Sequence, residues 1–189
     1  MKPWADPRGE YWVFGYGSLM WRPGFPHLEG HSARIFGYHR ALCVWSWFHR
    51  GTRDRPGLVF GLERGGSCRG RAYRVSAADR AAVQDYLYAR EMVTPVYRPL
   101  ELPVHLTGRV VSALAFVVDR AHPQYAGALE SDHAASVVAG AKGASGPNPE
   151  YVLNTHEHLR ALGIHDPHLN RICTHLLNSN HGRDRGRFE

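Results

Sequence analysis

Near its start the sequence reads Tyr11-Trp-Val-Phe-Gly-Tyr-Gly-Ser-Leu-Met-Trp21. The first four residues are aromatic or β-branched, as in a buried strand, and two glycines separated by one tyrosine follow them. Glycine lets the backbone turn sharply and approach a ligand, and successive N–H groups in such a turn suit a carboxylate or phosphate. The segment therefore predicts a strand that ends either in an anion-binding turn or in an ordinary β-turn with a packed tyrosine.

More strands are expected further along the chain. The last of them should be central, because it is apolar at consecutive positions and needs cover on both faces. The predicted strands are Arg34–Phe48, Gly57–Leu62, Arg69–Val75 and Arg109–Val118.

A helix is predicted between the third and fourth of these strands. Ser76 with Asp79 three residues later is a start like a capping box, and the helical spacing continues to about Glu91. The residues that share one helical face, and should turn toward a core, are Val83, Tyr86, Leu87, Arg90 and Glu91.

Prolines mark two helices near the C-terminus. Asn148-Pro149 places a cap residue before a first-turn proline, with a stop at Gly163, and Asp166-Pro167 repeats the arrangement. A weaker helix is expected over Ser131–Ala139. Strands and helices together predict an α+β fold, with an antiparallel sheet or barrel and helices packed on it.

Length and composition favour one domain. The chain has 189 residues and 43% hydrophobic residues, enough to build a core, and its last stretch is polar. We therefore expect a single domain over residues 11–177 and a disordered tail over residues 178–189. The net charge of +6 favours anionic partners without choosing among them.

Cysteine usage and hydropathy indicate the compartment. No run approaches the roughly 18 apolar residues of a membrane helix, and Met1–Pro7 lacks the apolar segment of a secretory signal. The sequence thus predicts a cytoplasmic protein that does not span a membrane. Reduced, buried thiols are expected at Cys43, Cys68 and Cys173, which include no Cys-x-x-Cys pair.

Glu91 is the first candidate for catalysis. It continues the helical face of Val83 and Leu87, so its carboxylate is expected to point toward the core or a cleft. Desolvation there would raise its pKa and make it a proton acceptor near neutral pH. The alternative is an ion pair with Arg90 or with another arginine at the helix end.

The sequence gives less support to a metal site, a serine nucleophile or a nucleic-acid-binding surface. His156 and His158 flank Glu157, but residues two apart do not share a helix face, so no metal site is predicted. No Gly-x-Ser-x-Gly motif marks a serine nucleophile. Trp45 and Trp47, followed by several arginines, could stack on bases and contact phosphates. A non-catalytic nucleic-acid-binding module therefore stays open as an alternative.

Four short motifs lie in order along the chain. They are Val13-Phe-Gly-Tyr-Gly-Ser-Leu-Met-Trp21, Gly70-Arg-Ala-Tyr-Arg-Val75, Tyr86-Leu87-x-x-Arg90-Glu91, and Gly143-Ala-Ser-Gly146 with Asn148-x-Glu150-Tyr151. The first looks like the Tyr-Gly-Ser-Leu signature of the ChaC-type, glutathione-specific γ-glutamylcyclotransferases. The others resemble that family's Gly-x-Ala-Tyr-Arg strand, its catalytic-glutamate segment and its late Ser-Gly-x-Asn-x-Glu-Tyr motif.

The resemblance implies a single-domain mixed β-barrel with helices, and a reaction that needs neither cofactor nor metal. In that reaction the α-amine of a γ-glutamyl group attacks its own γ-carbonyl, which releases 5-oxoproline and, from glutathione, cysteinylglycine. The resemblance implies Glu91 as general acid and base. The implied substrate-binding residues are Val13, Phe14, Gly15, Tyr16, Gly17, Ser18 and Leu19, with Tyr97 as candidate for the family's substrate-contacting tyrosine.

One departure from the family concerns specificity. Animal members follow the glutamate with Lys-Gly-Gly-Tyr, whereas this chain reads Met92-Val-Thr-Pro-Val-Tyr97, more like bacterial members. The pocket for the cysteinylglycine end therefore differs, and other γ-glutamyl peptides or amines stay open as substrates. We expect a lyase that cleaves glutathione, with nucleic acid not among its partners.

Overall fold

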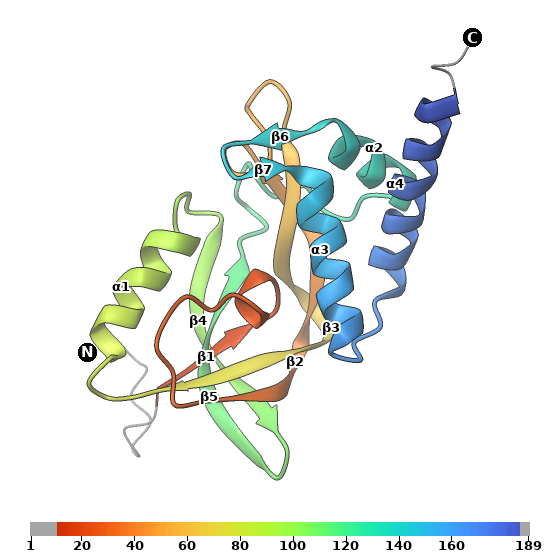
Figure 1. Ribbon diagram of the computed structural model, residues 1–189. Helices are drawn as coiled ribbons and strands as arrows, with labels where there is room; N and C mark the ends of the chain where they lie inside the picture. The colour runs from red at the N-terminus through yellow and green to blue at the C-terminus, as the bar shows by residue number, and fades with distance from the viewer. Residues whose placement is uncertain (1–10, 186–189) are drawn as a thin grey trace. The chain divides into compact units, whose positions relative to one another are not determined.

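The computed structural model describes residues 11–185, which form a closed five-strand barrel and four helices (Figure 1). The barrel order is β1-β3-β2-β4-β5, and β3 also pairs with β5. This architecture confirms the predicted α+β barrel with helices. Met1–Pro7, which was examined in the sequence for a secretory signal, lies outside the described residues. The barrel strands are β1 (Tyr11–Gly15), β2 (Glu29–Ser46), β3 (Gly57–Val75), β4 (Tyr97–Leu106) and β5 (Arg109–Val118).

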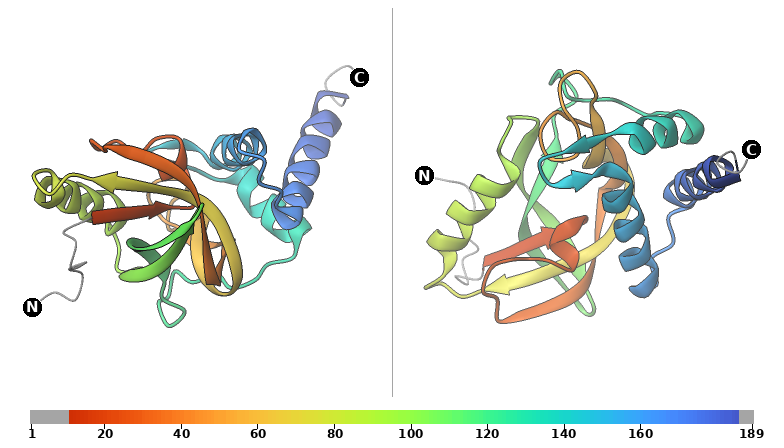
Figure 2. Two further views of the ribbon diagram at one scale, coloured as in Figure 1. Left: turned by 90° about the horizontal axis from the view of Figure 1, so that it is seen from below. Right: turned by 45° about the horizontal axis from the view of Figure 1, so that its top comes forward.

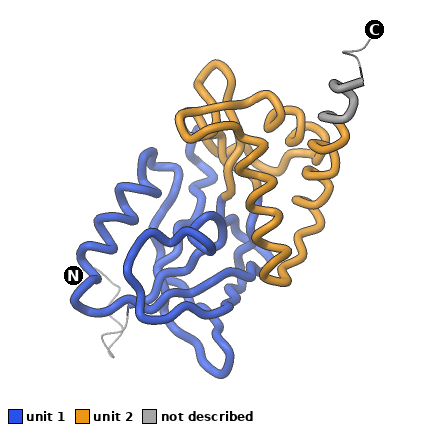
Figure 3. Tube along the Cα trace, in the orientation of Figure 1, with its two compact units in different colours: residues 1–41, 61–123 blue, residues 42–60, 124–189 orange. Residues whose placement is uncertain are grey.

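The chain divides into two compact units, each made of two segments (Figure 3). Unit 1 comprises residues 1–41 and 61–123, and unit 2 comprises residues 42–60 and 124–189. Unit 1 contains β1, β4, β5 and the first helix, whereas the other three helices belong to unit 2. The strands β2 and β3 continue from one unit into the other.

The first strand is held along both edges. β1 pairs antiparallel with β3, from Tyr11 opposite Val75 to Gly15 opposite Arg71, and it pairs parallel with β5. All five of its residues are buried. The position at which β1 ends, and the glycine turn begins, is therefore fixed by two neighbouring strands.

The third strand is longer than predicted. Gly57–Leu62 and Arg69–Val75 were expected as separate strands, but both belong to the continuous strand β3. Gly65 and Gly66 lie between them with φ of +108° and +66°, a region that glycine adopts without steric cost. The glycines therefore mark a local change of backbone conformation and not the end of the strand.

The fourth strand was not predicted, because Pro99 and Pro103 obscure it. Both prolines nevertheless lie inside the β4–β5 ladder, opposite Phe116 and Ser112. On its other side β4 pairs with β2 at only two positions. A missing N–H is tolerated on a strand edge that is largely unpaired, which explains why proline is compatible with this position. The predicted strand Arg109–Val118 is confirmed as β5.

The first helix, α1 (Arg80–Glu91), begins three residues later than predicted, with Asp79 in place of Ser76 as its cap residue. Ser76 Oγ donates to the Asp79 carboxylate at 2.7 Å and accepts the Asp79 N–H at 3.1 Å, so the expected capping box forms a turn that precedes the helix. In Figure 2 the helix lies beside the barrel. As predicted, its face is buried in unit 1, in a cluster that includes Tyr11, Val13, Leu19, Phe25, Tyr73, Val83, Leu87, Leu114 and Phe116.

Unit 2 contains α2 (Ser131–Gly140), α3 (Asn148–Ala161) and α4 (Pro167–Arg185), together with the two-residue strands β6 (Lys142–Gly143) and β7 (Gly146–Pro147). The Asp166 carboxylate accepts the Leu169 N–H at 3.0 Å, which confirms the predicted cap of α4. That helix includes residues 178–185 of the predicted tail, and residues 186–189 lie outside the described range. Among the described helices, none is long and apolar enough to cross a membrane.

Asn148 does not have the predicted role of a helix cap. The cap residue of α3 is Pro147, and Asn148 is fully buried in the first helical turn. Its Oδ1 accepts the Leu58 N–H at 2.7 Å, and its Nδ2 donates to the Leu58 carbonyl at 2.8 Å. The side-chain amide therefore pairs with both polar backbone groups of one β3 residue, as a neighbouring strand would.

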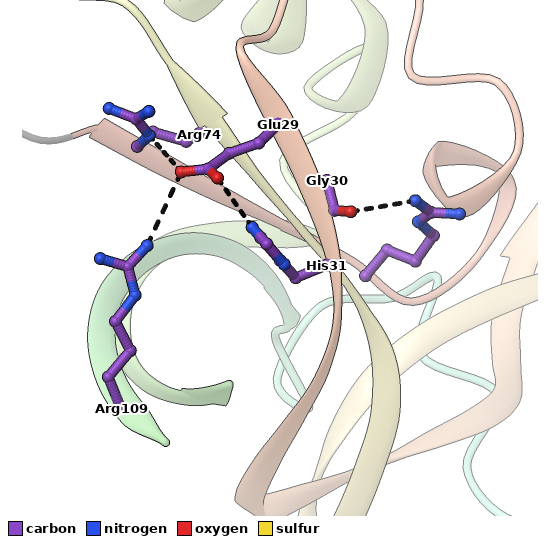
Figure 4. A network of polar contacts seen from close by, with 6 residues as sticks. Glu29, Gly30, His31, Arg74 and Arg109 are labelled. Atoms are coloured by element: carbon purple, nitrogen blue, oxygen red, sulfur yellow. Dashed lines mark hydrogen bonds and ion pairs between the residues drawn. The ribbon is translucent and has the colours of Figure 1, made fainter. Parts of the chain in front are cut away.

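A polar network centred on Glu29 joins three strands of unit 1 (Figure 4). Glu29 and His31 of β2 lie 3.0 Å apart, and Arg74 of β3 donates to the other carboxylate oxygen. Arg109 of β5 is 3.7 Å from that oxygen and stacks on Trp12, with its Cζ 5.1 Å from the ring centre. The network holds the ends of these strands in register on the barrel surface.

Asn148→Ala is expected to lower the free energy of unfolding by about 2–4 kcal/mol, because two buried backbone groups lose their partners. Urea denaturation measures the effect. The matched control is Asn154→Ala, at an exposed position of the same helix, for which we expect a change within about 0.5 kcal/mol. Equal stabilities of the two variants would contradict a structural role for the Asn148–Leu58 pair.

Candidate active site

The turn after β1, residues 15–19, is here called the β1 turn. It leaves the strand at Gly15 and continues into a short 3-10 helix, η1 (Ser18–Met20). Tyr16 is buried and donates its hydroxyl proton to the Phe116 carbonyl at 2.8 Å. The side chains of Val13, Phe14 and Leu19 are buried as well. Of the predicted binding residues up to Leu19, only the backbone and the Ser18 hydroxyl are therefore placed to contact a ligand.

The two glycines of the β1 turn differ in what surrounds them. A Cβ on Gly15 would lie 2.9 Å from the Leu19 Cβ, so packing alone requires glycine there. A Cβ on Gly17 would meet no atom within 4 Å beyond those of its two chain neighbours. The space beside Gly17 is open, whereas the space beside Gly15 is filled.

Glu91 is the last residue of α1, and its side chain retains 21% of its exposure. Burial raises the pKa of the carboxyl above its usual value, and the adjacent Arg90 guanidinium opposes this rise. The carbonyl end of a helix also disfavours a negative charge, which acts in the same direction as burial. A carboxylate with a raised pKa is a stronger proton acceptor than an exposed one.

Arg90 connects Glu91 to the β1 turn. Its Nε lies 3.1 Å from Glu91 Oε1, and its Nη2 donates to Ser18 Oγ at 2.8 Å. The sequence left open whether Glu91 is a buried base or the partner of Arg90, and the structure shows a largely buried carboxylate that is also paired with Arg90. The predicted base and the predicted clamp therefore share one guanidinium.

The chain after the β1 turn packs tightly around this arginine. Arg90 Nη1 donates to Tyr86 Oη at 2.8 Å and to the carbonyls of Arg22 and Pro23 at 2.9 and 3.2 Å. Gly24 has a φ of +74°, and a Cβ there would lie 2.0 Å from Tyr86 Oη. Only glycine fits this approach, so the position of Arg90 is tightly determined.

Arg40 of β2 is a site residue that the sequence did not reveal. Its side chain is buried, with 9% of the residue exposed, and its Nε donates to the Tyr16 carbonyl. Its Nη2 donates to the Arg69 carbonyl at 2.7 Å. From the sequence, the segment around Arg40 was predicted only to be a strand. The acceptors of its hydrogen bonds lie 24 and 29 residues away in the chain, so no local sequence pattern could predict these contacts.

Comparison with known proteins places this site in a family. The family model described as ChaC-like protein matches residues 11–179. The chain belongs to the ChaC-like family. A curated relative, the glutathione-specific γ-glutamylcyclotransferase of Escherichia coli (strain K12), is 36% identical over 165 residues, which cover 87% of this chain and 71% of the relative. Glutathione-specific γ-glutamylcyclotransferase 1 of Homo sapiens is 33% identical over 175 residues, covering 89% and 78%.

A solved structure shares the fold of this ChaC-like chain. The crystal structure of a γ-glutamyl cyclotransferase specific to glutathione from yeast superposes with a TM-score of 0.82 and covers 89% of this chain and 96% of its own. The two sequences are 22% identical, so the likeness concerns the barrel and its helices.

Tyr97 is the remaining predicted binding residue. It begins β4 opposite Val118 and packs against the hydrophobic cluster of unit 1. The preceding loop is anchored, because Val96 is buried and its carbonyl accepts the Asp119 N–H at 2.8 Å. The segment in which this ChaC-like chain departs from animal members is therefore fixed at its C-terminal end.

The other candidates of the sequence lie elsewhere. Trp45 and Trp47 are half-buried in unit 2, and the Arg53 guanidinium stacks on the Trp47 ring at 4.9 Å from its centre. His158 bonds to the Asn154 carbonyl at 2.7 Å. Within residues 11–185, no three His, Cys, Asp or Glu side chains group closely enough to hold a metal ion. The three cysteines are confirmed as buried thiols, and none of them forms a disulfide.

The raised pKa of Glu91 predicts a particular dependence of stability on pH. Below its ordinary value of 4.5, Glu91 is protonated in both the folded and the unfolded chain. As pH rises, the unfolded chain loses this proton first, so the contribution of Glu91 to the free energy of unfolding falls until the pH exceeds the raised folded pKa. Glu91→Gln should therefore gain stability relative to wild type across this window.

Urea denaturation at a series of pH values measures this difference. Asp85→Asn, at an exposed position of the same helix, is the matched control and should show no comparable gain. A difference between Glu91→Gln and wild type that stays constant with pH would contradict the raised pKa.

Proposed function

We propose that this protein is a γ-glutamylcyclotransferase that cleaves glutathione into 5-oxoproline and cysteinylglycine. Its family and the names of two relatives, 36% and 33% identical, support this substrate. In the proposed site Glu91 is the general base, and the β1 turn binds the γ-glutamyl end. The observation that carries the proposal is the Arg90 side chain, which joins Ser18 of the turn to the Glu91 carboxylate.

The proposed reaction needs proton transfer and correct geometry. Glu91 takes a proton from the substrate's α-ammonium group, and the free amine attacks the γ-carbonyl carbon. A C–N bond closes the five-membered ring, and the original amide C–N bond breaks as the leaving nitrogen receives the proton from Glu91. The ring nitrogen then gives up its second proton, which ends on the leaving amine, so the products are the lactam 5-oxoproline and an ammonium group. Because the nucleophile and the carbonyl belong to one molecule, holding the substrate folded supplies much of the acceleration.

The open space beside Gly17 supports the binding half of the proposal. Apart from Gly17 and its two chain neighbours, no residue has an atom within 4 Å of where a Gly17 Cβ would be, so a ligand can approach the backbone there. The buried side chains of Val13, Phe14, Tyr16 and Leu19 support the turn from behind. We propose that they act by fixing its backbone, and that Tyr97 contacts the substrate at the start of β4.

Specificity for glutathione is the finer part of the proposal. The loop between α1 and β4 differs from that of animal members, and Val93 is exposed on it. Other γ-glutamyl peptides or amines are therefore the second candidate substrates.

A nucleic-acid-binding module has less support, because Arg53 already covers one face of Trp47. Three buried cysteines that form no disulfide are consistent with a reducing compartment, and we propose a cytoplasmic location.

Glu91→Gln tests the reaction and the base together. The variant keeps the shape of the side chain and removes its proton acceptor, so we expect a loss of about 10²-fold or more in turnover of glutathione, the low end for general-base catalysis. The measurement is quantification of 5-oxoproline. Asp85→Asn removes a charge from the exposed side of the same helix and should leave turnover unchanged.

Each outcome of this assay has a distinct meaning. Equal turnover by wild type and Glu91→Gln would keep the reaction and reject Glu91 as the base. No product from glutathione, but product from another γ-glutamyl compound, would reject the proposed substrate alone. No product from any of them by the folded protein would reject the proposed function.

Gly17→Ala tests the binding role of the β1 turn. The added methyl group meets no protein atom, so the thermal unfolding temperature should stay close to that of wild type, whereas KM should rise because the methyl occupies ligand space. Gly15→Ala is the opposite case, since its methyl group collides with Leu19, and it should lower stability. An unchanged KM in a folded Gly17→Ala variant would place the ligand elsewhere.

A further inference from the structure

The three carbonyl groups at the centre of the β1 turn all accept hydrogen bonds. The carbonyl oxygens of residues 16–18 accept hydrogen bonds from the Arg40 side chain, from the Met20 N–H at 2.9 Å and from the Arg22 N–H at 2.9 Å. Each of these donors comes from the protein itself. At residues 16–18 every carbonyl oxygen thus already has a donor from the protein, so this part of the turn has little to attract a hydrogen-bond donor such as an ammonium group.

The Ser18 hydroxyl is committed in the same way. It accepts a hydrogen bond from Arg90 Nη2 at 2.8 Å, and because a guanidinium has no acceptor, the hydroxyl proton must be donated elsewhere. The N–H groups of Gly17 and Ser18 donate to no residue within the described chain. Two amide protons and one hydroxyl proton are thus left for a ligand.

Arg40 fixes the direction of one of these donors. In a trans peptide the carbonyl oxygen and the next N–H point in opposite directions, so a guanidinium that holds the Tyr16 oxygen also aims the Gly17 N–H away from itself. A charged donor on the oxygen polarises the peptide as well, which strengthens the N–H as a donor. Arg40 also lies 3.8 Å from the Met20 sulfur and so touches the turn on both sides of Ser18.

The charge of Arg40 is not neutralised locally. Within residues 11–185 it pairs with no carboxylate, and its hydrogen bonds go to two carbonyl oxygens and one sulfur. A buried cation without a counter-ion is costly in an empty site and favours an anion next to it. Arg90 adds a second positive charge, shared with Glu91.

From this geometry we propose that Arg40 and Arg90 are positioning residues that make the β1 turn a donor-only site selective for a carboxylate. The inference rests on the proposed function and adds which substrate group the turn recognises, namely the α-carboxylate of the γ-glutamyl group. Arg40 fixes the direction of the Gly17 N–H. Arg90 fixes the orientation of the Ser18 hydroxyl and also holds the Glu91 carboxylate nearby. The α-amine is then left to face the base and not the turn.

The test compares γ-glutamyl substrates that carry an α-carboxylate with the same compounds as α-carboxamides. Wild type should prefer the carboxylate. In Arg90→Gln and Arg40→Met the ratio of kcat/KM between the two substrates should fall about 10-fold, the size expected for loss of one charge-assisted hydrogen bond. A purely structural role would lower both values together and leave the ratio unchanged.

Arg34→Gln is the matched control. Arg34 lies six residues before Arg40 on β2, is exposed, and donates to Ser67 Oγ at 2.8 Å. The ratio should be the same in this variant as in wild type. Because Arg40 is buried, circular dichroism first shows whether Arg40→Met folds; if it does not, the half-buried Arg90→Gln decides the test.

Two results would overturn the inference: a wild-type ratio near one, or an unchanged ratio in folded Arg90→Gln. If wild type cleaves no γ-glutamyl compound, the proposed function fails separately, and binding decides the inference. The Gly17 and Ser18 amide signals in NMR spectra should then shift with L-glutamate and not with its α-carboxamide in wild type, and should shift less in Arg90→Gln. Equal responses to both ligands would reject a carboxylate site.

Discussion

The geometry of the site depends on hydrogen bonding along both edges of β1. An isolated strand of five residues is not stable in one position. This strand is fixed because it pairs antiparallel with β3 and parallel with β5, and because every residue in it is buried. Its end point cannot slide without moving two other strands. The β1 turn, which contains the open position at Gly17, is thereby supported by the most constrained part of unit 1. A backbone that binds a ligand needs such support, because it cannot adapt by changing rotamers.

The arrangement of charge around the turn favours function over stability. Arg40 is buried and has no carboxylate partner among residues 11–185, and Glu91 is desolvated at the carbonyl end of a helix. Each position carries a free-energy cost that an apolar residue would avoid. Arg90 offsets only the second cost, because its guanidinium pairs with the Glu91 carboxylate while it also holds Ser18. A single guanidinium thus contacts both the Glu91 carboxylate and the Ser18 hydroxyl.

Much of this could be predicted from the sequence where local pattern was sufficient. The buried face of α1, the cap at Asp166 and the strand β5 follow from spacing alone. The strand β4 was missed because its prolines argue against a strand, although an edge with few partners tolerates them. Arg40 and Asn148 were missed or misread because their partners, 24 and 90 residues away, exist only in the folded chain. Likewise, the different surroundings of Gly15 and Gly17 are a property of three-dimensional packing.

The division into two units has a consequence for how the chain can be altered. Neither unit is a continuous piece of the sequence, and β2 and β3 pass through both. No single cut in the gene separates them, and a boundary placed at residue 41 or 60 would fall inside β2 or β3. Recombination or truncation cannot exchange one unit and spare the other, so the two must be inherited, expressed and redesigned as one module. Variation is more easily accepted at the connections outside these two strands than at the junctions of the units.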